Sequence, residues 1–179
     1  HQAVLAADEC GQWDQLHKTS TIALAGDDSS MATIEGPAGW RHAVMGTKVM
    51  RAGVHTWEVR VETCTGKPYL MFGVARRGTV ACPTAYTKTD VWLFYAQPDG
   101  PHKCTKYTGG GSAGAYGCPV FAGDTVRVRL DLDGGGVLSF WVNGQPLGAA
   151  FEGLAGEFVP CVNIYAAGTT VRLLRAERS

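Results

Sequence analysis

The sequence predicts an all-β domain built as an antiparallel two-sheet β-sandwich, and three observations lead to that fold class. Short apolar runs, alternating or continuous, recur along the 179 residues with turn residues between them. The chain contains 24 Gly and 8 Pro, which favours many turns over long helices. The stretch from Ala122 to Ala150 predicts three strands joined by two tight turns. Short strands at such spacing are typical of β-sandwiches.

The first elements of the sandwich are expected from Trp13 onward, because Gln2 to Cys10 has no β period. Three strands and one loop follow: Thr21–Ala25, Met31–Ile34, the loop Gly36–Gly39, and Arg41–Met45. Between the first two strands, Gly26-Asp27-Asp28 predicts a turn, because Asp side chains there bond to nearby backbone groups.

The next strands show both burial patterns that a sandwich requires. From His55 to Glu62, apolar Trp57, Val59 and Val61 alternate with charged residues, which predicts one buried and one solvated face. Tyr69 to Ala75 is a continuous apolar run, and its length and composition suit a strand covered on both faces. Further strands are expected at Val91–Ala96, Cys104–Tyr107, Phe158–Ile164 and Thr169–Leu174.

The stretch after residue 122 gives the most detailed prediction. In Thr125–Asp131 every second residue is apolar, so one face of the strand should be buried, with Val128 at its centre. Asp133–Gly136 breaks this strand, and the apolar run Val137–Val142 is expected to return beside it. Asn143-Gly144 then predicts a type I′ turn, which needs positive φ at both central residues.

Four segments together resemble one known family. Trp40–Gly46 resembles a W-x-S-V-x-G segment, Gly53–Val59 follows G-x-H-x-W-E-V, and Gly73–Arg76 reads GVAR. The segment LDLDGGGVLSFWVNGQPLGAAFEGLAGEFVP contains an LD-x-D element, a V/L-S-F strand, an NG turn and a closing Pro. In this order and spacing the segments are similar to a SPRY domain, from about Trp13 to about Leu174. The resemblance implies a bent antiparallel two-sheet sandwich of concanavalin-like architecture.

The expected organisation is a single SPRY domain at 13–175, with an N-terminal extension or tag remnant at 1–12 and a C-terminal tail at 176–179. The chain begins with His rather than Met, so we expect a segment cut from a longer protein. Any native targeting signal could then lie outside it. From the resemblance we expect a cytoplasmic (intracellular) protein.

Composition argues against several classes of function. The formal net charge is zero and the pI is about 7.1, whereas nucleic-acid binding favours a basic surface. No apolar run approaches 18 residues, so no membrane span is expected. The six cysteines form no C-x-x-C pair and the five histidines no i, i+4 pair, so we expect no metal or cofactor. The thiols are expected to be reduced and partly buried.

Three patterns that suggest chemistry have simpler structural explanations. Gly110–Gly114 matches the G-x-S-x-G of a hydrolase elbow, but no His follows residue 102, so we expect a flexible surface connection there and no enzyme. Asp131-Leu132-Asp133-Gly134 lacks the later ligands of a calcium loop, so a hairpin turn is expected. The Trp residues are core candidates, and of the five only Trp13 and Trp40 are expected to be partly exposed.

Function is therefore expected at the surface, and here the resemblance supplies the expectation. SPRY domains are non-enzymatic recognition modules that bind a partner peptide across loops at one end of the sandwich. They often serve as substrate receptors of ubiquitin ligases. Within the family, the chain resembles the SPRY-SOCS-box proteins. By their pattern, the partner-binding residues would be Pro37, Ala38, Gly39, Trp40, Lys67, Pro68, Tyr86, Thr87, Tyr165 and Ala166.

One departure from that pattern affects the expected ligand. Ala166 stands where the SPRY-SOCS-box proteins have a pocket-lining Trp, which argues against their acidic, Asn-rich peptide preference. We expect a monomeric module that binds a protein or peptide, and neither nucleic acid nor membrane. Two alternatives remain open: a carbohydrate-binding, lectin-like β-sandwich, and an esterase that uses Ser112.

Overall fold

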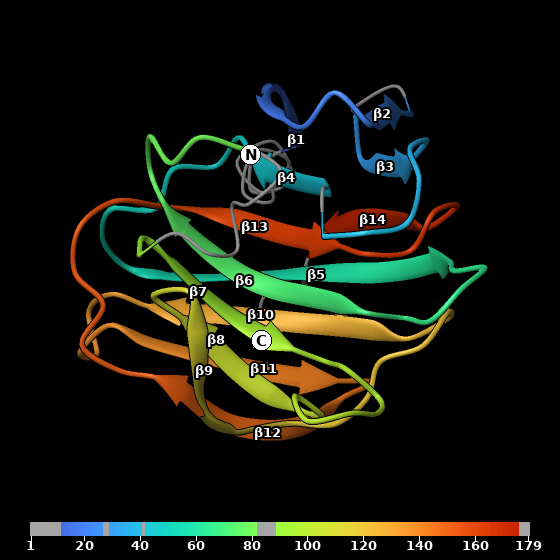
Figure 1. Cartoon of the computed structure of the whole chain (residues 1–179). Coiled ribbons are helices and arrows are strands. Elements are labelled where there is room, and N and C mark those ends of the chain that lie inside the picture. The colour runs from blue at the N-terminus through green and yellow to red at the C-terminus, as the bar shows by residue number, and fades with distance from the viewer. Residues whose placement is uncertain (1–11, 27–28, 41, 82–88, 176–179) are drawn as a thin grey trace.

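The computed structural model describes residues 12–26, 29–40, 42–81 and 89–175. These residues form fourteen strands in two antiparallel sheets of seven, and no helix occurs among them (Figure 1). The all-β sandwich predicted from the sequence is confirmed. None of the described segments is a helix long and apolar enough to cross a membrane.

The two sheets, named A and B, are each assembled from strands that are distant in the sequence. Sheet A has the order β1 (Trp13–Lys18), β4 (His42–Gly46), β13 (Phe158–Ile164), β6 (Leu70–Arg76), β7 (Val91–Tyr95), β8 (Thr105–Thr108) and β9 (Gly111–Ala115). Sheet B has the order β12 (Gln145–Phe151), β11 (Val137–Val142), β10 (Thr125–Asp131), β5 (Val54–Thr63), β14 (Thr170–Arg175), β3 (Met31–Ile34) and β2 (Ile22–Ala25).

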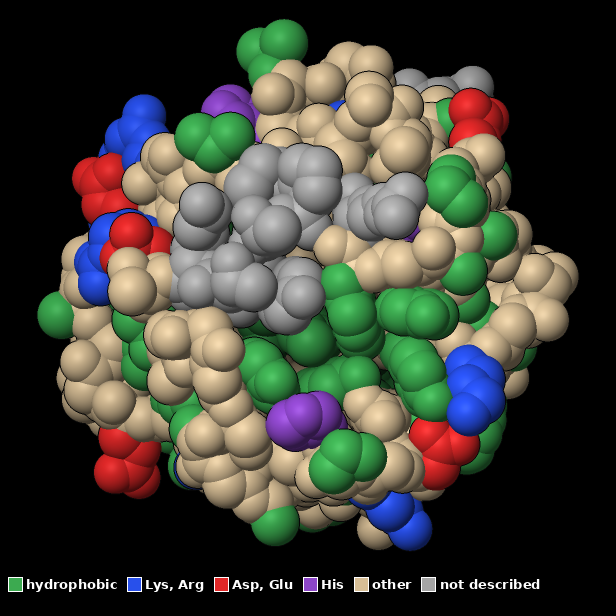
Figure 2. Space-filling model, viewed as in Figure 1, with side chains coloured by type: hydrophobic (Ala, Val, Ile, Leu, Met, Phe, Trp, Pro, Cys, Tyr) green, Lys and Arg blue, Asp and Glu red, His purple; other side chains and the backbone are tan. Residues whose placement is uncertain are grey.

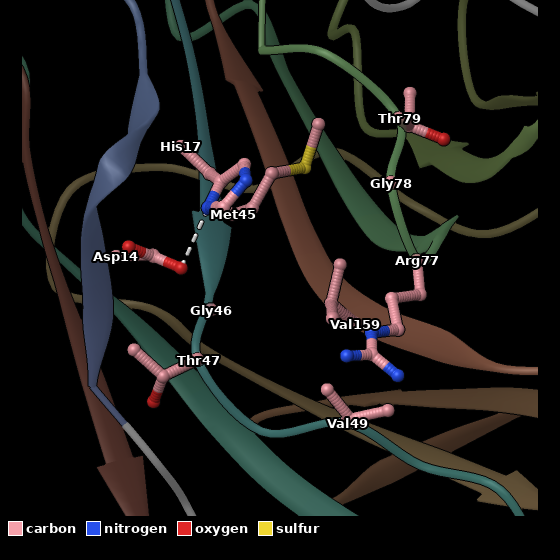
Figure 3. Close-up of a pocket in the computed structure, with 10 residues that line it drawn as sticks. All are labelled: Asp14, His17, Met45, Gly46, Thr47, Val49, Arg77, Gly78, Thr79 and Val159. Carbon is pink, nitrogen blue, oxygen red and sulfur yellow. Dashed lines mark hydrogen bonds and ion pairs between the residues drawn. The ribbon is translucent and has the colours of Figure 1, made fainter.

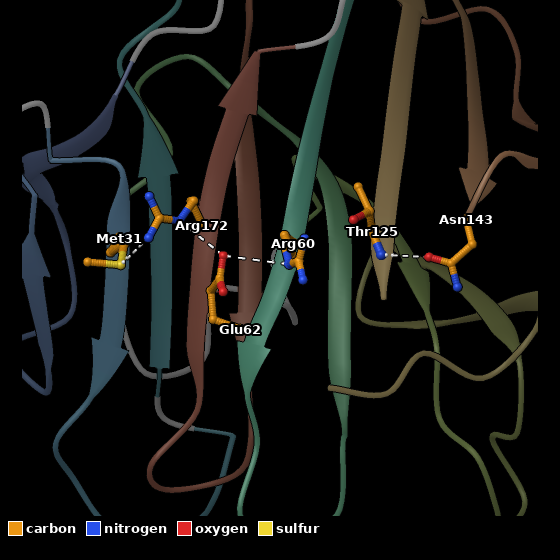
Figure 4. A network of polar contacts seen from close by, with 6 residues as sticks. All are labelled: Met31, Arg60, Glu62, Thr125, Asn143 and Arg172. Carbon is orange, nitrogen blue, oxygen red and sulfur yellow. Dashed lines mark hydrogen bonds and ion pairs between the residues drawn. The ribbon is translucent and has the colours of Figure 1, made fainter. Parts of the chain in front are cut away.

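The triple-stranded unit β10, β11 and β12 forms as its sequence pattern predicts. Val128 is fully buried, and its Cα partners are Trp57 on β5 and Phe140 on β11. Asn143 and Gly144 have φ values of 50° and 80°, as a type I′ turn requires. The Asn143 side chain also closes the turn, because its Oδ1 accepts a hydrogen bond of 2.9 Å from the backbone N–H of Thr125 (Figure 4).

Strand β6 is buried on both faces, as its continuous apolar run predicts. Phe72 and its even-numbered neighbours pack into the main core between the sheets. Met71 and Ala75 instead belong to a second cluster on the outer face of sheet A, the face directed away from sheet B. We call this the outer cluster; its buried members are Ala43, Met45, Met71, Ala75, Val91, Leu93, Tyr95 and Cys161.

Three expectations about individual residues are wrong. Trp13, expected to be partly exposed, is 1% exposed in β1 and belongs to the main core. Trp141, expected in the core, is half-buried, because alternation along β11 turns Phe140 inward and Trp141 outward. Gly110–Gly114 is no loose connection: Gly111–Ala115 forms β9, which pairs with β8 through Tyr107 and Ser112.

The outer face of sheet B carries a ladder of ion pairs rather than an apolar patch. Glu62 accepts a hydrogen bond of 3.0 Å from Arg172 and lies 3.7 Å from Arg60 (Figure 4). Arg127 pairs with Glu58 at 3.2 Å, so neighbouring strands are linked by opposite charges. Exposed pairs of this kind contribute little stability individually. They keep this part of the outer face of sheet B solvated.

Candidate partner-binding site

Aromatic side chains gather at one end of sheet A. At this end β4 and β6 begin while β13 and β7 finish, because the antiparallel register sets His42 beside Ile164 and Met71 beside Tyr95. The residues at or just beyond these strand ends therefore come together from four separate parts of the chain. We call them the aromatic cluster: Trp40, Tyr69, Tyr95 and Tyr165.

The four rings of the aromatic cluster are packed edge to face. The ring centroids of Trp40 lie 5.3 Å from Tyr95 and 5.5 Å from Tyr165, and those of Tyr69 and Tyr165 lie 5.3 Å apart. Such contacts are favourable because the ring edge is positive and the ring face negative. Tyr95 is buried, whereas the other three rings are half-buried. The cluster is thus a preformed surface that is partly accessible to a ligand.

The loop before β4 is fixed against this cluster by hydrogen bonds. The backbone N–H of Gly39 donates to the carbonyl of Tyr165 over 2.8 Å. His42, which is 1% exposed, lies 2.8 Å from the carbonyl of Pro37 through Nε2 and 2.6 Å from the Thr21 hydroxyl through Nδ1. Because a carbonyl only accepts, Nε2 of His42 donates to Pro37, and Nδ1 shares the second hydrogen bond with the Thr21 hydroxyl. Buried His42 therefore positions an exposed loop.

A second loop, before β6, adds charge to the rim of the site. The Tyr69 hydroxyl donates to Asp99 over 2.7 Å, and the Lys67 ammonium lies 3.2 Å from the same carboxylate. These two partners, Tyr69 first and then Lys67, hold the pKa of Asp99 below its usual value. Lys67 also lies 5.6 Å from the centroid of the Tyr69 ring. The rim is therefore polar and ionised beside an aromatic interior.

The surface itself is hollowed at this face. Figure 2, in the same view as Figure 1, shows hydrophobic side chains gathered in a hollow in the middle of the viewed face, with a His side chain at its edge. His102 contributes a further ring to the cluster, 6.5 Å from Tyr95 and 6.0 Å from Tyr107. His102 therefore extends the row of aromatic contacts beyond Tyr95.

Most of the residues predicted from the sequence meet at this site. The structure brings together Pro37, Ala38, Gly39, Trp40, Lys67, Pro68 and Tyr165. Ala166 is only 3% exposed, and its Cβ would lie 3.5 Å from a Cβ built on Gly66, so it packs behind the rim loop. Tyr86 and Thr87 lie outside the described residues.

Comparison with known proteins decides the family. The model of the SPRY domain family matches residues 54–177, more than half of the chain. The chain belongs to the SPRY family. SPRY is a protein-interaction fold, and its members are generally non-catalytic modules.

Solved structures show the same fold across nearly the whole SPRY domain. The SPRY domain of human HERC1 superposes with a TM-score of 0.71 at 20% identity, over 93% of this chain and 99% of that one. The PSpry domain of TRIM65 gives 0.70 at 19% identity, over 92% of each chain. Stonustoxin gives 0.68 at 17% identity, over 91% of this chain and 28% of the toxin chain. At these identities the likeness establishes the fold.

Sequence reasoning missed several residues of the site in this SPRY domain. Tyr69 and Tyr95 were assigned to strands, with no role in binding, and Asp99, His102 and Tyr107 were not singled out. A signal for the first two was present, because each stands at the end of an apolar run. Strand ends at a sheet edge are where binding residues are commonly placed.

The patterns that suggested other chemistry serve structural purposes. Asp131 Oδ1 accepts from the backbone N–H of Gly134 over 2.6 Å within the hairpin turn. Asp133 Oδ1 accepts from the backbone N–H of Gly53 over 2.9 Å, which links the turn to the residue before β5. Ser112 is exposed in edge strand β9. Among the described residues, no three His, Cys, Asp or Glu side chains lie close enough to hold a metal ion. The cysteines with described positions, Cys64, Cys104, Cys118 and Cys161, are free thiols.

Proposed function

We propose that this SPRY domain binds a partner protein or peptide through the aromatic cluster and the two loops beside it. The observation that supports the proposal most directly is the convergence of Trp40, Tyr69, Tyr95 and Tyr165 at one end of sheet A. Four separate chain segments supply these rings, and three of the rings remain partly exposed. The exposed parts of these rings provide apolar surface that a partner can cover.

The physical properties of the cluster suit recognition of a peptide. Tyr and Trp offer large, rigid contact areas and a polar group at low entropic cost, and binding hot spots are enriched in them. Their mutual edge contacts hold them in place before any ligand arrives, which reduces the ordering cost of binding. The loop hydrogen bonds of Gly39 and His42 have the same effect. Lys67 and Asp99 at the rim would favour one orientation of a charged partner.

The domain would act as a recognition or scaffold unit of a larger, cytoplasmic protein. Substrate recognition in ubiquitin ligation is one form that this role would take. The binding event is proposed to be non-catalytic and to involve neither nucleic acid nor membrane. The overall charge of zero agrees with this, because it provides no excess of cations for either surface.

Affinity purification from the source cell tests the proposal, with Trp40→Ala as the test variant and Trp141→Ala as its matched control. Both tryptophans are half-buried, but Trp40 belongs to the cluster while Trp141 lies on β11 of sheet B. Partners that bind here should be lost with Trp40→Ala and kept with Trp141→Ala, when both variants are compared at a temperature where each is folded. Equal retention by both variants would exclude the cluster as the site. Binding to a glycan array that calcium chelation abolishes would instead favour the lectin-like alternative.

A further inference from the structure

A separate pocket lies at the opposite end of the outer face of sheet A. Its walls come from β1, from the end of β4, from the start of β13 and from the residues that follow β6 (Figure 3). The antiparallel register places Phe158 beside Arg76 there, at the end of these strands that is remote from the aromatic cluster. The cavity volume is about 340 Å³, which is near the lower end for ligand pockets.

The floor of the pocket is apolar. Met45, Val49 and Val159 line it, and Met45 is 1% exposed within the outer cluster. Val49 and Val159 are half-buried, so part of their surface faces the cavity. An apolar ligand group of moderate size would bury this surface and gain the free energy of its removal from water.

One wall carries an excess of positive charge. Glu157 lies between two guanidinium groups, 2.9 Å from Arg51 and 3.0 Å from Arg77. Arg77 first, and then Arg51, holds the pKa of Glu157 below its usual value, so the carboxylate is ionised at neutral pH. Two positive charges therefore share a single negative one.

Of the two arginines, only Arg77 lines the pocket. Figure 3 shows its guanidinium between Val159 and Val49, beside the apolar floor. Its Nη1 donates to Glu157, whereas a guanidinium has five N–H donors in a planar fork. Arg77 can therefore bind a further carboxylate without releasing the one it already holds.

The opposite wall restricts the charge of the ligand. Asp14 accepts the backbone N–H of Leu16 over 2.9 Å and contacts Nδ1 of His17 over 2.8 Å. This carboxylate is already paired, and its negative charge opposes a dianion such as phosphate in the same cavity. The walls together suit a single negative charge next to an apolar group.

We propose that this pocket binds the C-terminal residue of a peptide that ends in a branched apolar side chain such as Leu or Val. In a C-terminal residue the carboxylate and the side chain are attached to the same Cα, so both fit a cavity of this small volume. An acidic side chain would need a second residue to supply the apolar group. The carboxylate would pair with Arg77 and the side chain would cover Met45, Val49 and Val159.

This inference goes beyond the proposed function, because the pocket and the aromatic cluster lie at different ends of sheet A and share no residue. The C-terminal pocket would act as an independent site. Its test can therefore fail while binding at the aromatic cluster holds, and the reverse is equally true.

The test is an amide-resolved NMR titration of the chain with N-acetyl-leucine, compared with N-acetyl-leucinamide, which lacks only the negative charge. N-acetyl-leucine should shift the amides of Thr47, Gly78 and Thr79 saturably, and the amide should bind at least about fivefold more weakly. Arg77→Gln should weaken N-acetyl-leucine binding at least about fivefold. Arg51→Gln removes the other guanidinium bound to Glu157 but lies outside the pocket, so it should change affinity by no more than about twofold.

Each contrary result has a definite meaning. Equal binding of the acid and the amide would show that no carboxylate is recognised, and equal weakening by the two arginine variants would show only a long-range charge effect. Tighter binding of inorganic phosphate than of N-acetyl-leucine would overturn the assignment to a monoanion. Both arginines are more than half exposed, so the variants should unfold at the same temperature as the parent.

Discussion

Replacing Val128 with Asp tests the fold at its best-defined point. Val128 is 0% exposed. It lies on an inner strand of sheet B, between Trp57 and Phe140 on the neighbouring strands. A carboxyl group placed there would have no water and would stay protonated in the folded state. Holding it protonated at pH 7, about 3 units above its free pKa of about 3.9, costs about 4 kcal/mol at 1.36 kcal/mol per unit.

The loss of Val burial adds about 1.5 to 2 kcal/mol, so Val128→Asp should cost about 6 kcal/mol at pH 7. That is comparable to the whole free energy of unfolding of a typical domain, about 5 to 15 kcal/mol. The folded-state pKa is raised, so the unfolded state releases a proton above about pH 4 that the folded state keeps. The loss of unfolding free energy caused by Val128→Asp should therefore grow as pH rises from about 4 to 7, and should become about 4 kcal/mol smaller on acidification.

Urea denaturation followed by Trp fluorescence, at pH 5, 6 and 7, measures this cost against the parent. Val128→Asn is the matched control, because it loses the same packing and buries a polar group but cannot ionise. Its deficit relative to the parent should not depend on pH in this range. If Val128→Asp is as stable as the parent, the register of β10 is shifted by one residue and the side chain points outward.

Four further predictions concern separate features of the chain. Gly73→Ala would direct a Cβ into the backbone carbonyl oxygen of Trp92, so it should lower the free energy of unfolding by about 1 to 3 kcal/mol or more in the same denaturation assay. An unchanged urea midpoint would contradict the close approach of β6 and β7. Burial raises the pKa of the Cys161 thiol to about 12 from 9.0, so this thiol should resist iodoacetamide at pH 8 in the native protein. The free energy of unfolding should fall as pH rises from about 9 to 12, because the unfolded state loses the thiol proton first. Alkylation of Cys161 in folded protein, detected by mass spectrometry, would refute this. Tyr86→Ala should weaken a partner bound at the predicted site by roughly 2 kcal/mol, about 30-fold, with little change in thermal unfolding; full retention of partners, or unfolding, would remove Tyr86 from the site. Ser112→Ala should leave any ester hydrolysis unchanged and calcium should give no thermal shift, whereas a calcium-dependent shift would favour the lectin-like alternative.

The strands that the sequence predicted well are those in which side chains alone decide burial. Val137–Val142 and Phe158–Ile164 have the predicted bounds, because their apolar residues define a face or fill both faces. Gly111–Ala115 could not be predicted in that way, since Gly, Ser and Ala carry almost no apolar pattern. It becomes a strand through backbone pairing with β8, which no local pattern of side chains specifies. Trp13 was misjudged for a related reason: its burial depends on β1 joining the edge of sheet A beside β4.

The residues of the candidate site also fall into those that the sequence could predict and those that it could not. The resemblance identified the loops at Pro37–Trp40 and Lys67–Pro68, because they stand next to recognisable family segments, at the positions of the family's binding loops. Asp99 and Tyr107 could not be found from sequence, because they reach the site only through the spatial order of β6, β7 and β8. Neither residue has a distinctive neighbour in the chain. Their place follows from sheet topology, which a single sequence states only indirectly.

The two apolar faces of sheet A explain why the site lies where it does. A sheet in a two-layer sandwich normally buries one face and exposes the other, yet Met71 and Leu93 are 1% and 0% exposed on the outer face. Trp40 and Tyr69 pack against this outer cluster, so the rings that would contact a partner also cover part of the protein's own apolar surface. Stability and binding are therefore coupled at this end of the sheet. Trp40→Ala should lower both, and loss of a partner identifies a binding site only when the variant is compared at a temperature where it is folded.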